Sequence, residues 1–174
     1  MVGVGPPVNV VRGGHLQSLR RVTRALRHKE ATGEKGIRWR KTMGAWGHGS
    51  FENDSALDWV ENAFKPAGAA AVESALRYAA ESAEDLYLDI DEASAVIAAA
   101  EFVAAAKDGD LSKLGTTQND FATHRQSLTS PHLLPLARRA LQRVLRKSEL
   151  QELWTEGQDK SWLNEMTNLL ARLR

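Results

Sequence analysis

Two aspartates at the start of a predicted helix are the first residues whose type and spacing could support chemistry. Asp54 and Asp58 are four residues apart, so a helix would place both carboxylates on one face, with Glu61 close by. Like charges at this spacing repel each other, and a divalent cation such as magnesium or calcium could bridge them. We favour a structural interpretation, because acidic residues in a first helical turn are stabilised by the helix dipole and Asn53 or Asp54 can cap the helix. In that interpretation Asp58 could also accept hydrogen bonds from the amides of the preceding loop.

Glu101 is the next candidate. It is the only ionisable residue between Glu92 and Lys107, on a segment with no polar face. Burying a lone carboxylate costs several kcal/mol, so we expect this one to be hydrogen-bonded, paired with a cation, bound to a metal or protonated.

Several partners could satisfy Glu101. The candidates are the indole N–H groups of Trp46 and Trp59, the amides of the preceding loop, and an arginine from the segment 133–146. Perturbed acids are enriched at functional sites, but most buried polar groups are simply hydrogen-bonded. A structural role for Glu101 is therefore favoured over catalysis.

A glycine-rich loop, Gly44-Ala45-Trp46-Gly47-His48-Gly49, precedes the predicted helix. Glycine amides beside a helix N-terminus attract anions. The spacing matches neither the Rossmann fingerprint nor the P-loop, and Glu52 and Asp54 bring negative charge to the place of a phosphate. Phosphate binding is therefore disfavoured. Ser50 lacks the G-x-S-x-G setting of a nucleophile, and none of the five histidines has metal-ligand spacing.

Helices must position these groups, because no stretch alternates in the pattern of a β-strand. The spacing of apolar residues predicts an all-α fold, a compact bundle of five or six helices in a single domain over residues 43–174. The predicted helices are Ser55–Phe64, Ala67–Ser82, one capped by Asp91 and ending near 107–109, Leu133–Arg146, one capped by Ser148 and broken at Gly157, and one starting at Asp159 or Ser161.

One helix should lie at the centre of the bundle and one segment should be irregular. Residues 93–106 are apolar on all sides, which is typical of a helix surrounded by others. The segment 111–131 is rich in Ser, Thr, Gly and Asn and is predicted to be a long loop with at most one helical turn.

The segment Met43–Val60, MGAWGHGSFENDSALDWV, contains the pattern G-x-F-x-N-D-x-A-x-D. It resembles the opening of a bacterial family known as domain of unknown function 4259. The residues that carry the pattern are Gly49, Phe51, Asn53, Asp54, Ala56 and Asp58.

Weaker similarity to the family continues along the chain. Tyr87-Leu88, the run 98–101 and the stretch 148–154 are also similar to the family, and the similarity is loosest around 111–131. The resemblance implies no activity, because the family has none assigned. The remaining motif or structural positions that it indicates are Gly44, Trp46, Gly47, Glu101 and Trp154.

The composition of the 174 residues is 43% hydrophobic and 26% charged, which is typical of a soluble globular domain. There is no cysteine, which excludes disulfides, thiolate metal sites and cysteine nucleophiles. The charge is unevenly distributed. Residues 1–42 hold ten Lys/Arg and two Glu, whereas residues 43–174 hold thirteen Lys/Arg and twenty Asp/Glu.

Residues 1–42 are predicted to be a basic extension, disordered or partly helical. Apolar residues between Leu16 and Leu26 recur at helical spacing with arginines opposite them, so this arm could bind nucleic acid or an anionic membrane surface. We favour the alternative that translation begins at Met43, because the arm has no counterpart in the family pattern.

These observations predict a small helical protein that binds another macromolecule without catalysis. The alternative is a metal-dependent enzyme that uses Asp54, Asp58 and Glu101, and a weaker one is binding of nucleic acid or an anionic membrane through the arm. No cofactor is predicted. No run approaches a transmembrane span and the N-terminus does not fit a signal peptide, so a cytoplasmic location is expected.

Overall fold

The computed structural model describes residues 47–156 and 159–174. The regular elements in these ranges are all helical, and the described residues pair in β geometry only at one isolated bridge between Leu88 and Ser148. The all-α prediction is confirmed. The predicted arm (1–42), the motif positions Gly44 and Trp46, and the helix break at Gly157 lie outside the described residues.

The first helical stretch follows directly from the motif. It consists of α3 (Asp54–Trp59), the π-helical segment η1 (Val60–Phe64) and α4 (Lys65–Ala67). Asn53 is the cap, because its side-chain oxygen accepts a hydrogen bond of 2.7 Å from the Ala56 N–H.

This stretch runs three residues beyond the predicted helix Ser55–Phe64 and ends one residue after Pro66. The wide π turn closes with a hydrogen bond from the Lys65 N–H to the Val60 carbonyl, so Pro66 stands in the first turn of α4. A proline is tolerated there, since that position needs no N–H donor within the helix. The stretch ends at Gly68, whose φ of 54° favours glycine.

Two helices follow. Helix α5 (Ala69–Glu81) buries Val72, Leu76 and Ala79, as their helical spacing predicts. Helix α6 (Ile90–Asp108) begins two residues earlier than expected, since Asp89 and Glu92 form a capping box. The predicted cap Asp91 is therefore wrong, and its carboxylate instead accepts a hydrogen bond of 2.6 Å from the Ser55 hydroxyl.

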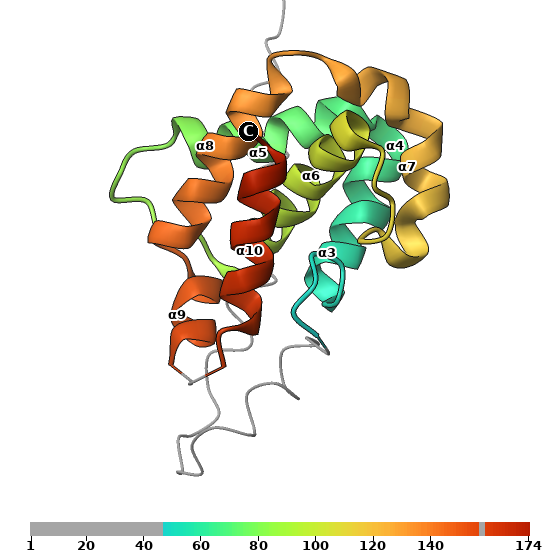
Figure 1. The fold of residues 1–174 in the computed structure, drawn as a ribbon. Helices are drawn as coiled ribbons and strands as arrows, with labels where there is room; N and C mark the ends of the chain where they lie inside the picture. Colours follow the sequence, from blue (N-terminus) through green and yellow to red (C-terminus); the bar gives the residue numbers. More distant parts are fainter. Residues whose placement is uncertain (1–46, 157–158) are drawn as a thin grey trace, which may run out of the picture. The chain divides into compact units, whose positions relative to one another are not determined.

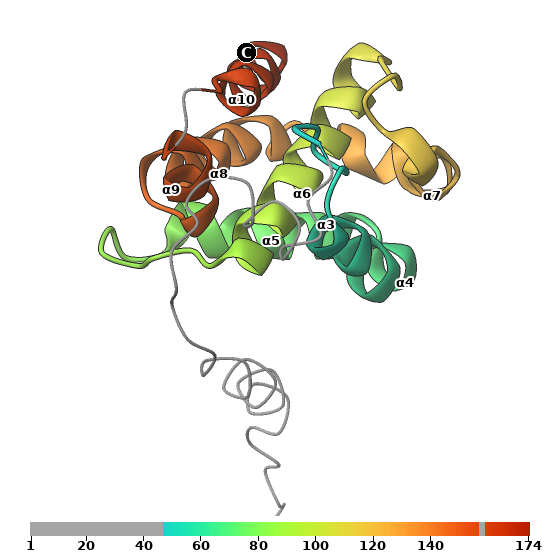
Figure 2. The ribbon, with the colours of Figure 1, turned by 90° about the horizontal axis from the view of Figure 1, so that it is seen from below.

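Helix α6 occupies the centre of the fold. Every residue from 93 to 106 except Ala95 is buried. The helix contacts α3, α5, α8, α9 and α10, and Figures 1 and 2 show it crossing between them. A helix that is apolar all round can be covered only by neighbours on all sides, which confirms the predicted central position.

The segment predicted as a long loop is largely helical. It contains η2 (Gly115–Thr117), α7 (Gln118–His124) and η3 (Arg125–Thr129). Its buried residues Leu114, Phe121 and Leu128 recur every seven positions, so one narrow apolar line docks the segment. The loop prediction was wrong because it was based on the polar composition of the segment. Three widely spaced apolar residues are enough to dock these helices, but they are too few to change that composition.

Phe102 of α6 joins the two sides of this region. Its ring centroid lies 5.0 Å from that of Phe51, 4.1 Å from that of Phe64 and 5.8 Å from that of Phe121. The motif segment, the π segment and α7 are thereby packed against the same point of the central helix.

The C-terminal helices are α8 (Leu133–Arg146), α9 (Glu149–Thr155) and α10 (Ser161–Arg172). The bounds of α8 are those predicted. Ser148 caps α9 as its sequence predicts, accepting a hydrogen bond of 3.1 Å from the Gln151 N–H.

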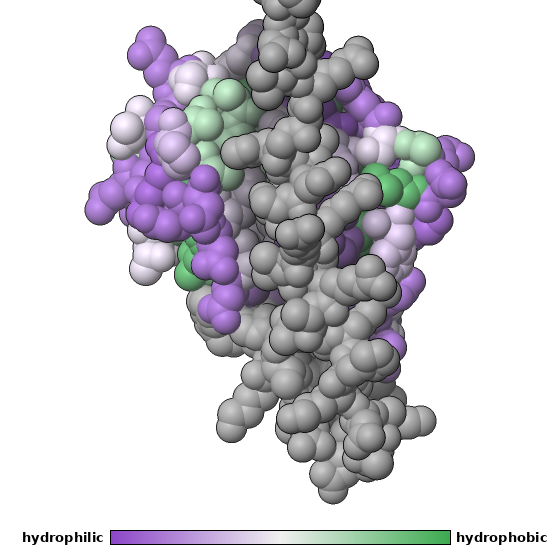
Figure 3. Space-filling view, turned by 180° about the vertical axis from the view of Figure 1, so that it is seen from behind, coloured by the Kyte–Doolittle hydropathy of each residue, from purple (hydrophilic) through white to green (hydrophobic). Residues whose placement is uncertain are grey.

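The outer surface of the described residues is largely polar. On the face drawn in Figure 3 the apolar areas are small and separate. Tyr78, Tyr87 and Leu163 are the large apolar residues with substantial exposure. Within the described ranges, none of the helices has the length and hydropathy needed to cross a bilayer.

Candidate functional site

The described part of the motif loop, residues 47–52, folds back on the side chain of Glu52. The Gly49 N–H donates a hydrogen bond of 2.9 Å to Glu52 Oε2, and the Glu52 N–H donates to the Gly49 carbonyl at 3.1 Å. Asp58 was expected to accept from these amides, but its side chain is exposed and Glu52 is the acceptor for Gly49.

Gly47 allows this close approach. A Cβ on Gly47 would lie 1.9 Å from Glu52 Oε2 and 2.4 Å from Glu52 Cδ, which is far inside van der Waals contact. Gly47 and Gly49 both lack a positive φ, so space rather than backbone conformation explains the glycine at position 47.

The loop also reaches the central helix through Ser50 and Phe51, which are both 6% exposed. The Ser50 hydroxyl donates a hydrogen bond of 2.9 Å to Glu101 Oε2. Glu101 is 3% exposed, so the buried carboxylate that the sequence predicts is present. Neither of its partners is among those expected. The first is the Ser50 hydroxyl and the second is Arg172 of α10.

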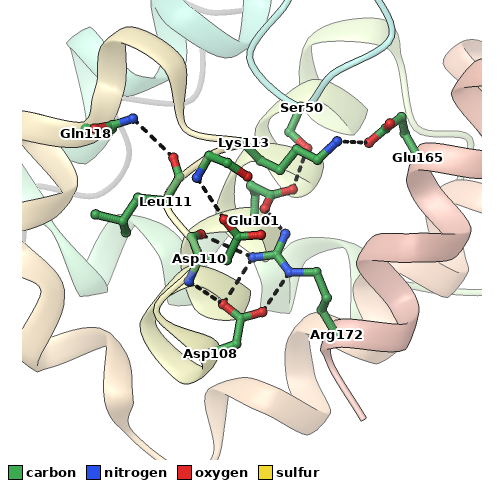
Figure 4. A network of polar contacts seen from close by, with 10 residues as sticks. Ser50, Glu101, Asp108, Asp110, Leu111, Lys113, Gln118, Glu165 and Arg172 are labelled. Carbon is green, nitrogen blue, oxygen red and sulfur yellow. Dashed lines mark hydrogen bonds and ion pairs between the residues drawn. The ribbon is translucent and has the colours of Figure 1, made fainter.

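Arg172 connects α10 to two carboxylates of α6. Its Nη1 donates to Glu101 Oε1, and its Nε and Nη2 donate to the two oxygens of Asp108 at 2.7 and 3.3 Å (Figure 4). Glu101 and Asp108 are seven residues apart, so both lie on the face of α6 that meets the end of α10. The expected arginine from the segment 133–146 is absent from this network. Arg143 is buried, but it donates to the carbonyls of Ala83 and Leu86.

The network favours the charged forms of Asp108 and Arg172. Burial alone would raise the pKa of Asp108, but hydrogen bonds from Arg172 and from the Asp110 N–H hold that pKa below its usual value of 3.8. Burial alone would lower the pKa of the Arg172 guanidinium, but its bond to Asp108 and the charge of Glu101 raise that pKa. Asp108 and Arg172 therefore keep their charges at neutral pH.

A cleft of about 740 Å³ opens above this network. Four segments form its walls: the motif loop, α3, the stretch 112–116 and the first half of α10. The residues that line it are His48, Gly49, Phe51, Glu52, Leu57, Ser112, Lys113, Gly115, Thr116, Ser161, Asn164 and Glu165.

Each charged or titratable side chain that lines the cleft has a partner within the chain. Lys113 Nζ lies 2.8 Å from Glu165 Oε2, and this bond raises the pKa of Lys113. His48 Nε2 lies 3.0 Å from Asp159 Oδ2, and Glu52 is bonded to the loop as described above. What the cleft offers to a ligand is therefore mainly apolar surface, hydroxyl groups and an amide.

Trp154 of α9 lies beside the His48 edge of the cleft. Its ring centroid is 4.9 Å from that of His48 and 6.5 Å from that of Trp162, with the two indoles nearly parallel at 8°. Trp154 thus helps to position the histidine of the motif loop.

Asp54, Asp58 and Glu101 are not brought together. Asp54 and Asp58 are exposed on α3, whereas Glu101 is buried and oriented towards Ser50 and Arg172. Across residues 47–156 and 159–174 there is no group of three or more His, Asp or Glu side chains arranged to hold a metal ion. The grouping of these three carboxylates that the metal alternative requires is therefore not formed, because Asp54 and Asp58 lie on the exposed side of α3 whereas Glu101 is buried in α6.

Arg172, Ser50 and Lys113 were not singled out from the sequence as site residues. Arg172 does carry a signal, because it stands between Leu169 and Leu173, two residues of the buried stripe of α10. A basic residue beside an apolar stripe is a candidate partner for an acid in an apolar helix, so Arg172 and Glu101 could have been paired from the sequence. The pairing of Lys113 with Glu165 has no comparable signal.

Comparisons with known proteins place the chain in a family. No curated protein and no solved structure gives a significant match. The family described as "Domain of unknown function (DUF4259)" matches residues 44–165, a range that includes the motif loop, Glu101, Lys113 and Glu165 but ends before Arg172. The chain therefore belongs to the DUF4259 family.

Proposed function

We propose that this domain is a binding module that holds a segment of another protein in the cleft between the motif loop and α10. The observation that carries the proposal is the pairing of the charged cleft residues inside the chain. Because these charges are paired within the chain, the contacts left for a ligand come mainly from apolar, hydroxyl and amide groups.

The remaining lining suits a polypeptide. Leu57 offers apolar contact, and Thr116, Ser161 and Asn164 offer hydroxyl and amide groups. Such mixed surfaces accept an apolar side chain together with hydrogen bonds to the main chain of a partner. Leu57 is only partly buried, so it remains available for contact.

The other two candidate functions have less support. The metal-dependent alternative required Asp54, Asp58 and Glu101 to converge, which they do not. The anionic-surface alternative depends on residues 1–42, which lie outside the described ranges.

Site-specific photo-crosslinking tests the proposal. A photoreactive residue at Thr116, which lines the cleft, is compared in the full chain with one at Glu84, which is exposed and does not line it. In cells of the native host we expect a discrete adduct from position 116 that position 84 does not give.

The partner is then identified by mass spectrometry and purified. Its binding to the full chain should weaken on Leu57→Arg and remain unchanged on Glu84→Arg. Equal labelling from both positions, or an affinity that Leu57→Arg leaves unchanged, would refute the proposed cleft.

A further inference from the structure

Helix α8 carries an exposed face that the cleft does not use. Pro135, Arg138, Arg139 and Gln142 are spaced i, i+3, i+4 and i+7, which places them on one side of the helix. All four are exposed, whereas the opposite side of α8 is buried in the core. Figure 1 shows α8 beside α10, whose C-terminal end adds residues to the same surface.

These residues surround an open hollow of about 440 Å³. Leu173 and Arg174 complete its lining, so three guanidinium groups, those of Arg138, Arg139 and Arg174, border one depression. The fourteen residues of α8 include four arginines and no acid. The lining of the hollow therefore contains three basic side chains and no acidic one, although residues 43–174 have an excess of seven acids.

The three arginines lack carboxylate partners among residues 47–156 and 159–174. Other arginines of the fold are engaged. Arg77 pairs with Glu73 and Glu81, and Arg172 pairs with Glu101 and Asp108. Lys107 Nζ donates a hydrogen bond of 2.9 Å to the main-chain oxygen of Arg174. That oxygen is therefore engaged by Lys107 and not by one of the three guanidinium groups.

We infer that the hollow bordered by Arg138, Arg139 and Arg174 binds a phosphate group of an anionic ligand. Guanidinium groups present planar pairs of N–H donors that match the oxygens of phosphate. Three cations around a single depression suit a group with concentrated negative charge better than single carboxylates spaced along a peptide. Gln142 supplies an amide donor, and Pro135 supplies apolar contact for the remainder of the ligand.

The phosphate could belong to a soluble molecule or to a lipid headgroup, and two probes distinguish these sources. Inorganic pyrophosphate is titrated into the full chain and followed through amide NMR signals. Phosphatidylcholine vesicles with and without phosphatidic acid are tested by flotation. Binding of pyrophosphate indicates a soluble ligand, whereas binding only to vesicles that contain phosphatidic acid indicates a headgroup.

A matched pair of variants locates the binding. Arg138→Gln with Arg139→Gln removes two adjacent arginines from α8, and Arg20→Gln with Arg21→Gln removes two adjacent arginines from the N-terminal segment. We expect the α8 variant to bind whichever probe binds the wild type about tenfold more weakly or worse, which corresponds to about 1.4 kcal/mol. The other variant should bind as the wild type does.

Two results would overturn the inference. One is the absence of binding to both probes at low ionic strength. The other is binding that the α8 variant retains and the Arg20/Arg21 variant loses. Thermal melts of both variants establish that each is folded, and the exposure of all four α8 face residues makes a folding defect unexpected.

Discussion

The guanidinium of Arg172, near the end of α10, donates a hydrogen bond to the carboxylate of Glu101, which is 71 residues earlier in the centre of α6. Glu101 is 3% exposed and the Arg172 side chain 20% exposed. The contact therefore joins the last helix to the core through charges that are largely shielded from water. Since Ser50 binds the other oxygen of Glu101, the motif loop depends on the same carboxylate.

Removing the arginine should destabilise the fold more than removing an exposed one. Arg172→Met leaves Glu101 buried with only Ser50 as a partner, and losing one member of a buried pair costs roughly 3 kcal/mol. Arg77→Met is the control, because Arg77 is 54% exposed and a surface pair contributes about 0.5 kcal/mol. Urea unfolding of both variants measures the difference.

A double-mutant cycle separates the pair from its surroundings. Glu101→Gln combined with Arg172→Met should lose less stability than the two single changes added together, because the buried side chain at position 101 is then no longer an unpaired carboxylate. Simple additivity would show that the two side chains do not stabilise each other.

The stabilising effect of Asp108 should disappear in acid. Its pKa in the folded protein is lower than its usual value of 3.8, so its contribution is complete above the unfolded pKa and is lost as the pH falls through the folded value. The free energy of unfolding of the wild type should therefore exceed that of Asp108→Asn at pH 7, with the difference shrinking below about pH 4. Urea melts from neutral to acidic pH test this, and a difference independent of pH would contradict it.

Phe121 should anchor the segment 111–131. Its side chain is 1% exposed and stacks near Phe102, so Phe121→Ala should cost about 3–5 kcal/mol. Asn119→Ala, an exposed change two residues earlier in α7, should cost about 0.5 kcal/mol or less. Equal melting temperatures for the two variants would show that the segment is not docked.

Glycine should be preferred at position 47 because of Glu52. Gly47→Ala places a methyl group where the Glu52 carboxylate lies, so this exposed, flexible side chain must move and loses its hydrogen bond from the Gly49 N–H; we expect a loss of about 1 kcal/mol. In the Glu52→Ala background the same substitution should cost less, since the clashing atoms are gone. Thermal denaturation of the four proteins measures this coupling, and the same cost in both backgrounds would contradict the proposed contact.

Much of the fold could be predicted because it depends on local patterns. The helical spacing of Val72, Leu76 and Ala79 corresponds to the buried face of α5, and Ser148 caps α9 as its sequence predicts. Residues 111–131 were wrongly predicted to be a loop, because their polar composition was given more weight than the seven-residue spacing of Leu114, Phe121 and Leu128. The cap of α6 was predicted two residues too late, at Asp91 instead of Asp89, because several acidic residues near the start of that helix could each act as a cap.

The sequence alone determined the helical class, the central position of α6, the burial of Glu101 and membership of the family. These follow from apolar periodicity and from the residues of one continuous motif. Only the tertiary structure decided which cation meets Glu101, which side chains line the cleft and which arginines of α8 remain unpaired. Those properties depend on the angles at which separate helices pack, and packing angles arise from side-chain contacts between segments far apart in the chain.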